Sequence, residues 1–254
     1  MDPSIIIFFE SGFNLIYLAL IWALVVLMTR NLPAVHEENR PAARSIRAAF
    51  ILLAAGDTGH VGFRVLGYAL GGLDTPVNIL GSSMSLAGLG TLSTSFTITL
   101  FYMILVIVWQ QRFRQKRSGL AGLLLAAGLV RLVLMALPGN DWAAVTPPYP
   151  MSIYRNIPLL LQGAGAAGLF LLSGYRTADR TFQTFGWMIF LSFAFYIPVI
   201  LFVQRIPMLG MLMIPKTCAY LAMAWAAYQG IWRQKGSPFR PPKPAPDAAA
   251  DMQA

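Results

Sequence analysis

Long apolar blocks alternate along the chain with short polar connections that are rich in arginine. Seven such blocks lie at residues 4–29, 46–72, 79–110, 119–138, 156–175, 182–204 and 207–231. An α-helix rises 1.5 Å per residue, so about 20 apolar residues cross a hydrocarbon core roughly 30 Å thick. Each block is long enough for that crossing. The pattern therefore predicts an all-α, seven-transmembrane-helix bundle.

Composition supports a membrane environment. Of the 254 residues, 57% are hydrophobic and only 11% are charged, whereas a soluble domain carries about 25% charged residues. We therefore predict a multi-pass membrane protein that has membrane lipid as its surroundings. From Ser237 onwards the chain is rich in proline and alanine without an apolar period. This divides the sequence into a transmembrane domain at 1–236 and a disordered cytoplasmic tail at 237–254.

The basic residues lie mostly in the connections on one side of the predicted bundle. Fourteen of the 19 lysines and arginines are there, namely Arg30, Arg40, Arg44, Arg47, Arg112, Arg114, Lys116, Arg117, Arg176, Arg180, Arg233, Lys235, Arg240 and Lys243. The opposite side has Arg155 and Arg205. Cytoplasmic connections carry the excess of positive charge. We therefore predict the N-terminus outside and the C-terminus inside, in the cell (cytoplasmic or inner) membrane, and no nucleic-acid partner.

Proline shapes two further expectations. The connection at 137–156 contains four prolines, and we expect a stiff lid there in preference to a helix. Pro215 lies inside the last apolar block. Because proline removes a backbone hydrogen bond of the helix, we expect a kink at that position.

Six ionisable residues fall inside the apolar blocks: Glu10, Asp57, His60, Arg64, Arg131 and Lys216. Such groups are costly at membrane depth and usually face the interior of the bundle, so each is a candidate site residue. His60 is the only histidine among them, and a zinc site with three histidine ligands cannot be completed. We therefore predict no metal.

Asp57, His60 and Arg64 are the most informative of these residues. They occupy positions i, i+3 and i+7 of the segment GDTGHVGFR, which places all three on one face of a helix. The same two residues, Asp57 and His60, are the candidates for an acid–base pair in catalysis.

Two further polar stripes lie at a similar depth. Glu10, Asn14 and Tyr17 share one face of the first block, and Lys216 and Tyr220 are four residues apart in the last. Counting 1.5 Å per residue from the predicted helix ends places these groups in the middle and outer half of the bilayer. We therefore expect a polar cavity that opens toward the outside.

The charges of this cavity do not balance. Three cations face two carboxylates, and we expect Asp57 to pair with Lys216 and Glu10 with Arg64. The remaining cation, Arg131, favours an anionic ligand headgroup such as a phosphate or a carboxylate. The alternative is that these groups only hold the helices together through ion pairs and hydrogen bonds.

The block at 79–110 is rich in hydroxyl side chains, with nine serines and threonines between Ser82 and Thr99. They could line a wet cavity. We favour the other interpretation, in which they bond to their own backbone and allow close packing between helices.

Two resemblances follow from these residues. A lysine in the seventh helix of an N-out bundle resembles microbial rhodopsins, which would imply retinal on Lys216. However, the third block has no acidic counterion, and Asp57 would have to serve in its place. The segments GDTGHVGFR and MIPKTCAY resemble bacterial seven-helix membrane proteins with G-D-x-x-H-x-x-x-R and P-K-T patterns, for which no activity is implied.

We interpret the protein as a membrane receptor or binding protein for a small or lipid-like anionic ligand. The ligand site would include Asp57, His60, Arg64, Arg131, Lys216, Glu10, Asn14 and Tyr220. Three alternatives remain open: a lipid-acting enzyme that uses Asp57 and His60, a retinal-binding protein, and a proton-coupled transporter. Apart from retinal, no cofactor is expected. The identity of the ligand and the oligomeric state are left open.

Overall fold

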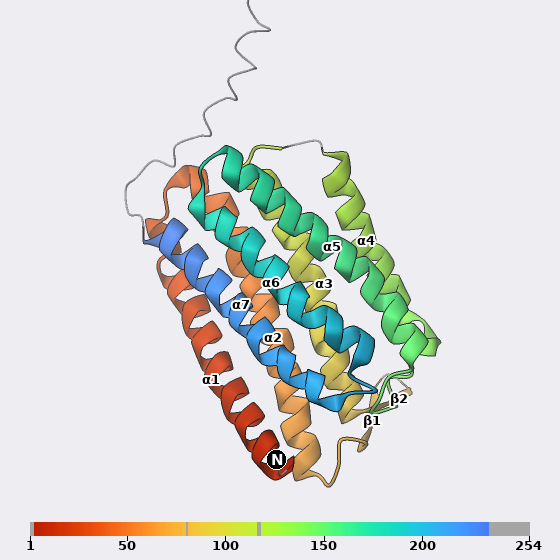
Figure 1. The fold of residues 1–254 in the computed structure, drawn as a ribbon. Helices are drawn as coiled ribbons and strands as arrows, with labels where there is room; N and C mark the ends of the chain where they lie inside the picture. The colour runs from red at the N-terminus through yellow and green to blue at the C-terminus, as the bar shows by residue number, and fades with distance from the viewer. Residues whose placement is uncertain (1–2, 80, 116–117, 234–254) are drawn as a thin grey trace, which may run out of the picture.

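The computed structural model describes residues 3–79, 81–115 and 118–233, with side chains from Gly12 onwards. Its helices are α1 (Pro3–Arg30), α2 (Arg40–Ala69), α3 (Leu86–Arg112), α4 (Gly119–Ala136), α5 (Tyr149–Arg176), α6 (Arg180–Phe202) and α7 (Met213–Ala227), as Figure 1 shows. Within these ranges, seven helices are long and apolar enough to cross a membrane. The predicted all-α, multi-pass architecture is confirmed. The predicted tail at 237–254 lies outside the described residues.

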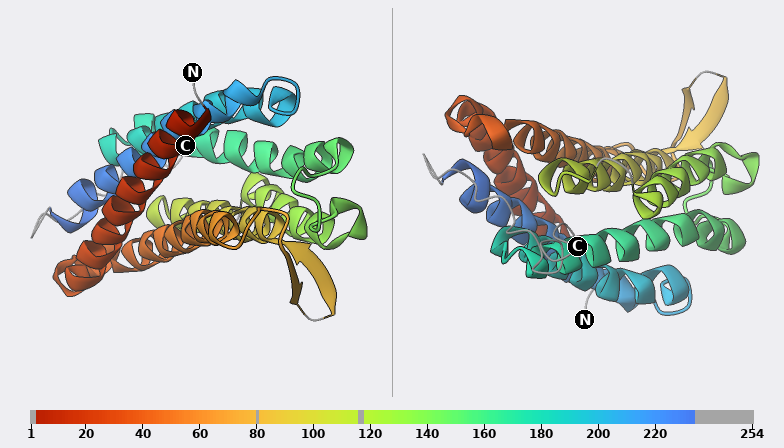
Figure 2. Two further views of the ribbon diagram at one scale, coloured as in Figure 1. Left: turned by 90° about the horizontal axis from the view of Figure 1, so that it is seen from below. Right: turned by 90° about the horizontal axis from the view of Figure 1, so that it is seen from above.

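The helices form a closed bundle in chain order. Each helix contacts the next, and α1 also contacts α7. Viewed along the bundle, α1 crosses one side between α2 and α7 (Figure 2). Side chains on the inner faces of neighbouring helices can therefore approach one another inside the bundle.

One end of the bundle carries a small antiparallel hairpin between α2 and α3. Strand β1 (Pro76–Ile79) pairs with β2 (Ser82–Ser85), and Gly81 adopts a φ of +83° in the turn. We call this end, with the connections at 70–79, 81–85, 137–148 and 203–212, the hairpin end. The opposite end, with the connections at 31–39 and 177–179 and with residues 113–115, is called the basic end (Figure 1).

The hairpin corrects the predicted third block, which began at residue 79. Residues 82–85 are a strand, and α3 begins only at Leu86. The side chain of Ser85 accepts a hydrogen bond from the backbone N–H of Gly88 at 2.9 Å and so caps the helix. Because a capping serine satisfies one of the free N–H groups at a helix start, it favours the beginning of the helix at this position.

The connection predicted as a lid at 137–156 is shorter than expected. Helix α5 already begins at Tyr149, so residues 149–156 are helical. Pro148 precedes the helix and Pro150 lies in its first turn, where the missing N–H has no helical partner and the fixed φ suits the helix. The prolines therefore start this helix and do not exclude it.

Pro215 does not interrupt the seventh helix at mid-length. A 3-10 helix at Pro207–Leu212 comes first, and α7 begins at Met213. Pro215 thus lies in the first turn of α7, directly after the 3-10 helix, where its fixed φ suits the start of an α-helix. The predicted kink at Pro215 stays a prediction. The last turn, Tyr228–Trp232, is a π-helix.

The hydroxyl groups of α3 mostly bond to the backbone. Thr91, Thr97 and Thr99 each donate to the carbonyl oxygen four residues earlier, at 2.9, 2.9 and 2.7 Å. For these three residues the predicted backbone bonding is confirmed. Thr94 is different, because it turns toward a carboxylate of α2.

Candidate functional site

Asp57 lies where α1, α2 and α3 meet. Its Oδ2 accepts a hydrogen bond of 2.7 Å from the hydroxyl of Tyr17, and its Oδ1 accepts a longer one of 3.4 Å from the hydroxyl of Thr94. Tyr17 is only 3% exposed. Two neutral donors from neighbouring helices therefore hold this carboxylate inside the bundle.

Lys216 lies among aromatic rings at the start of α7. Its ammonium nitrogen is 4.2 Å from the centroid of the Tyr196 ring and 5.8 Å from that of Tyr220. A cation over a tyrosine ring within about 6 Å is attracted by the negative face of the ring. The predicted closeness of Lys216 and Tyr220 is thus found, and Tyr196 of α6 joins them.

Lys216 also interacts electrostatically with Asp57. The expected direct pair does not form, however. In the described part of the chain, the ion pairs within 4.0 Å are Arg40–Glu37 and Arg112–Asp179. Asp57 uses its oxygens for Tyr17 and Thr94, and the ammonium of Lys216 is left to face the rings.

Arg131 joins α4 to the two helices beside it and is only 1% exposed. Its Nε donates to the carbonyl oxygen of Arg155 at 2.9 Å. Its Nη1 donates to the Thr99 hydroxyl at 2.8 Å and to the Ser95 carbonyl oxygen at 3.2 Å. All of these acceptors are neutral, so they orient the guanidinium without compensating its charge.

Arg155 is a buried cation that the sequence analysis assigned to an outer connection. It is 5% exposed, lies 4.8 Å from the centroid of the Trp142 ring, and donates from Nη1 to Asn140 Oδ1 at 3.4 Å. The helical spacing of buried residues in α5 could have indicated it, since Arg155, Leu159, Gln162 and Ala166 share one face. It was missed because α5 was expected to begin at residue 156.

Tyr196 of α6 connects α7 and α5 beside these cations. Its ring contacts Lys216, and its hydroxyl donates to Asn156 Oδ1 at 3.3 Å, next to Arg155 in the chain. Arg131 in turn donates to the carbonyl oxygen of Arg155, and its positive charge repels those of Arg155 and Lys216. We call Lys216, Arg131 and Arg155 the cationic layer.

A pair of tyrosines borders the cationic layer. The hydroxyls of Tyr102 on α3 and Tyr220 on α7 are 3.0 Å apart and buried. The rings of Phe101, Tyr102 and Tyr220 meet edge to face. This aromatic packing gives Lys216 an apolar surrounding in which an unbalanced charge is costly.

His60 and Arg64 lie on α2 beyond Asp57. His60 faces α3 at Gly90, where an added Cβ would come within 3.1 Å of the His60 carbonyl oxygen. The Nδ1 atom of His60 is buried and has no hydrogen-bond partner among the described residues. His60 interacts electrostatically with Arg64 and Lys216. No hydrogen bond joins His60 to Asp57 within the described chain.

Among the described side chains, α1 contributes fewer residues to the candidate site than the sequence predicted. The side chain of Glu10 lies outside the described residues, so its expected pairing with Arg64 stays a prediction. Asn14 is half-buried and makes no hydrogen bond to the other candidates in the described part of the structure. Among the described side chains of α1, Tyr17 hydrogen-bonds to a candidate site residue.

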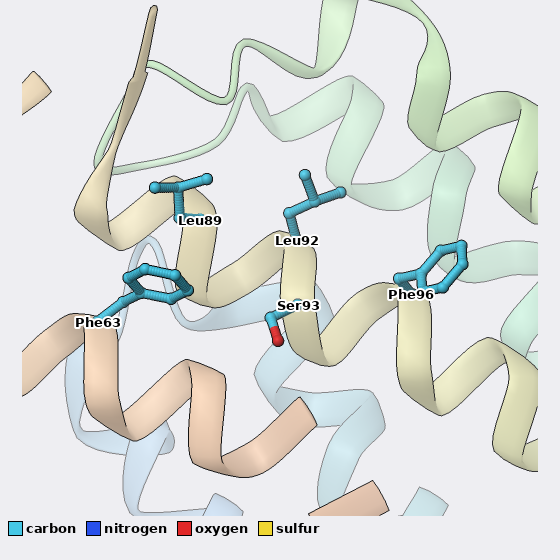
Figure 3. Close-up of a pocket in the computed structure, with 5 residues that line it drawn as sticks. All are labelled: Phe63, Leu89, Leu92, Ser93 and Phe96. Carbon is cyan, nitrogen blue, oxygen red and sulfur yellow. The ribbon is translucent and has the colours of Figure 1, made fainter. Parts of the chain in front are cut away.

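An apolar surface groove lies between α2 and α3, away from these polar residues. Phe63 of α2 and Leu89, Leu92, Ser93 and Phe96 of α3 line it (Figure 3). Phe96 is largely exposed. None of the candidate site residues lines this groove, and the expected polar cavity in the outer half stays a prediction.

Comparison of the chain with models of protein families, with curated proteins and with solved structures gives no match in any of the three.

Proposed function

We propose that this multi-pass membrane protein binds a small or lipid-like anionic ligand at the cationic layer. One observation supports the proposal above the others. Lys216, Arg131 and Arg155 come from three helices, and among the described residues none of them has a carboxylate within 4.0 Å. Uncompensated positive charge is costly in a low-dielectric interior, and a bound anion would offset it.

The three cations suit different tasks in binding. Lys216 is a compact point charge that can turn toward a ligand, whereas a guanidinium offers two parallel N–H groups to a carboxylate or phosphate. Arg131 is oriented by Thr99 and by backbone carbonyls. The guanidinium of Arg155 lies 4.8 Å from the centroid of the Trp142 ring, and Trp142 belongs to a connection at the hairpin end. We therefore propose that the ligand enters from that end.

The test uses decanoate and inorganic phosphate as probes, which represent a lipid-like and a small anion. Detergent-purified protein is titrated with each probe by calorimetry, and the variants are Lys216→Met and Arg155→Gln. We expect at least one probe to bind, and each variant to weaken it by about tenfold or more, as the loss of a buried charged hydrogen bond implies. Arg205→Gln is the matched control, because Arg205 is an exposed cation at the same end.

Two results would contradict the proposal. In one, neither probe binds; in the other, the probes bind equally well to the wild type, Lys216→Met and Arg155→Gln. A purely structural role predicts in addition that Asp57→Asn and Lys216→Met each destabilise the protein and that the double variant restores its stability.

A second candidate is covalent binding of retinal, which one feature favours. The amine of Lys216 lies beside two tyrosine rings and interacts electrostatically with the carboxylate of Asp57, which we propose as the counterion to a protonated Schiff base. Purification with all-trans-retinal tests it. A visible absorption band that Lys216→Ala abolishes would support it, and the absence of any band would exclude it.

We also propose the orientation with the N-terminus outside and the basic end in the cytoplasm, in the cell (cytoplasmic or inner) membrane. The bias of basic residues between the two ends supports it. A reporter enzyme that is active only outside the membrane, fused after Ala136 or after Arg112, measures this. We expect activity for the first fusion and none for the second; the reverse would overturn the orientation.

A further inference from the structure

Three arginines follow one another along the first two turns of α2, at the basic end of the bundle (Figure 1). Arg40, Arg44 and Arg47 occupy positions i, i+4 and i+7, which places them on one face of the helix. The buried residues of this part of α2, such as Ile46 and Phe50, lie on another face. Arg44 is exposed, whereas Arg40 and Arg47 are half-buried. We call these three residues the arginine stripe.

Little negative charge compensates the arginine stripe. The Oε1 atom of Glu37 is 3.8 Å from Nη1 of Arg40, but the Glu37 side chain is 88% exposed, so solvent screens this pair. Among the described residues, no carboxylate lies within 4.0 Å of Arg44 or Arg47. The first turn of α2 also contains no acidic residue, although negative charge is favourable at a helix start. The stripe is therefore a surface that favours an anion.

Two N–H donors of the arginine stripe are buried without an acceptor. They are the Nε atoms of Arg40 and Arg47, neither of which has a hydrogen-bond partner among the described residues. An unpaired N–H group that is shielded from water costs free energy, and the cost is larger when the group is charged. A guanidinium presents its N–H groups in a planar fork that fits two oxygens of a phosphate. A phosphate would therefore supply the acceptors that these donors lack.

The face of α2 that carries the arginine stripe becomes apolar toward the middle of the helix. Ile51 and Ala55 follow Arg47 at intervals of four residues, and Ala55 is exposed. Thr58 comes next on this face and accepts a hydrogen bond of 3.0 Å from Trp22 of α1. Helix α2 has 30 residues and is therefore about 45 Å long, which exceeds a hydrocarbon core of roughly 30 Å by about ten residues. This excess is enough to hold the stripe outside the core while Ile51 and Ala55 lie within it.

We propose that the arginine stripe binds the phosphate headgroup of an anionic phospholipid. Nε and one terminal nitrogen of Arg47 donate a parallel pair of hydrogen bonds to the phosphate, and Arg44 adds positive charge from the side of the solvent. The acyl chains lie along the apolar part of the same face, at Ile51 and Ala55. A free phosphate offers the same oxygens but has no apolar part for these two residues. The site lies outside the cationic layer and does not depend on the function proposed for that layer.

The test equilibrates detergent-purified protein with dioleoyl phosphatidylglycerol and measures the dissociation constant by native mass spectrometry. We expect Arg44→Gln and Arg47→Gln each to weaken binding about fivefold or more, because one arginine near an anionic headgroup contributes roughly this factor. Arg176→Gln is the matched control, since Arg176 is an exposed arginine at the end of α5 and also belongs to the basic end. It should change the affinity by less than about twofold, because salt screens exposed charges outside the site. Equal affinities of the wild type, Arg44→Gln and Arg47→Gln would overturn the proposal.

Arg47→Lys separates hydrogen bonding from charge. Lysine keeps the positive charge of Arg47 but lacks the Nε–H group and the planar fork. We expect this variant to bind the lipid nearly as weakly as Arg47→Gln. An affinity equal to that of the wild type would show that the stripe attracts lipid by charge alone and would overturn the headgroup site. Arg44 is exposed, so Arg44→Gln tests the site even if substitutions of Arg47 prevent folding.

Three further results would identify a different occupant or place, and each would overturn the proposal. Dioleoyl phosphatidylcholine carries the same phosphate with an attached cation, and an affinity equal to that of phosphatidylglycerol would exclude an anionic lipid as the preferred occupant. Displacement of the lipid by inorganic phosphate, in a manner that Arg47→Gln abolishes, would assign the stripe to a free anion. Loss of lipid binding in Lys216→Met but not in Arg44→Gln would place the lipid at the cationic layer, and the proposed function would then stand without this second site.

Discussion

Thr99 and Thr91 on α3 differ in one hydrogen bond. Both donate to the backbone carbonyl four residues earlier, but Thr99 also accepts from the guanidinium of Arg131. A hydrogen bond to a charged group contributes more than a neutral one, because leaving a buried charge without its acceptor costs its full desolvation. Single hydroxyls of the same helix are therefore unequal in their contribution to stability.

We expect Thr99→Val to lower the free energy of unfolding by about 1–3 kcal/mol, since Arg131 loses one of its acceptors. Thr91→Val is the control and should change it by less than about 0.5 kcal/mol. Thermal unfolding in detergent measures both. Equal losses would show that Thr99 does not stabilise the buried guanidinium.

The Arg112–Asp179 pair at the basic end is the buried ion pair of the described structure. The atoms Nη2 and Oδ2 are 2.7 Å apart, and the other oxygen of Asp179 accepts from the N–H groups of Thr181 and Phe182 at the start of α6. Burial raises the pKa of the Asp179 carboxyl above its ordinary value, even though Arg112 opposes this. The pair therefore recovers only part of the cost of burying the carboxylate.

Asp179→Asn keeps an oxygen for the helix cap but removes the charge. It should cost about 3 kcal/mol, because the guanidinium of Arg112 loses that carboxylate. The double variant Arg112→Met/Asp179→Asn should recover most of this loss. Chemical or thermal unfolding of the wild type, Asp179→Asn and the double variant measures these free energies. A double variant less stable than Asp179→Asn would contradict the prediction.

At the scale of elements, α2 and α3 approach each other closely through glycine. A Cβ added at Gly56 would collide with the side chain of Thr97, and one at Gly59 with Ser93. Gly62, on the same helix, has no atom within 4 Å of such a Cβ. The close approach is what brings Thr94 within hydrogen-bonding distance of Asp57.

Gly56→Ala should therefore destabilise the bundle by about 1–3 kcal/mol through overpacking. Gly62→Ala, in contrast, should leave stability unchanged or raise it by up to about 1 kcal/mol, because alanine loses less backbone entropy in a helix. Unfolding midpoints of the two variants make the comparison. If both alanines were tolerated equally, close packing would not be the reason for Gly56.

At the scale of the whole molecule, hydrogen bonds between the end of α1 and the π-helical turn Tyr228–Trp232 close the bundle at the basic end. Trp232 is 2% exposed, and its Nε1 donates to the carbonyl oxygen of Met28 at 2.8 Å. Asn31 Nδ2 donates to the hydroxyl of Tyr228 at 3.1 Å. These contacts join residues about two hundred positions apart and complete the ring of helices.

Trp232→Phe keeps most of the buried apolar surface but loses the donor. It should lower the free energy of unfolding by about 1 kcal/mol, since the Met28 carbonyl loses a partner. Trp187→Phe is the control, because Trp187 is 48% exposed and its Nε1 contacts an exposed Tyr175. An equal effect in the two variants would mean that the closing hydrogen bond adds nothing.

The sequence by itself determined the number of helices that are long and apolar enough to cross a membrane. This is a local property, because the length of an apolar segment decides whether it can cross the bilayer. The depth of Asp57 and Lys216 in the membrane stays a prediction. The sequence did not determine every helix start, because Pro148 and Pro150 suit the beginning of a helix as well as a connection.

Only the tertiary structure decided which side chains meet. The sequence predicted a direct ion pair between Asp57 and Lys216. In the structure, α1 and α3 pack against α2, and the Asp57 carboxylate accepts hydrogen bonds from Tyr17 and Thr94 instead. In the sequence, nothing distinguishes Tyr196 from the other aromatic residues of the apolar blocks. The packing of α6 against α7 and α5 places Lys216 over its ring and Asn156 beside its hydroxyl. Which side chains contact each other depends on how the helices are rotated and how far apart they lie. Contacts between segments distant in the chain set this geometry, and a local sequence pattern does not reveal it.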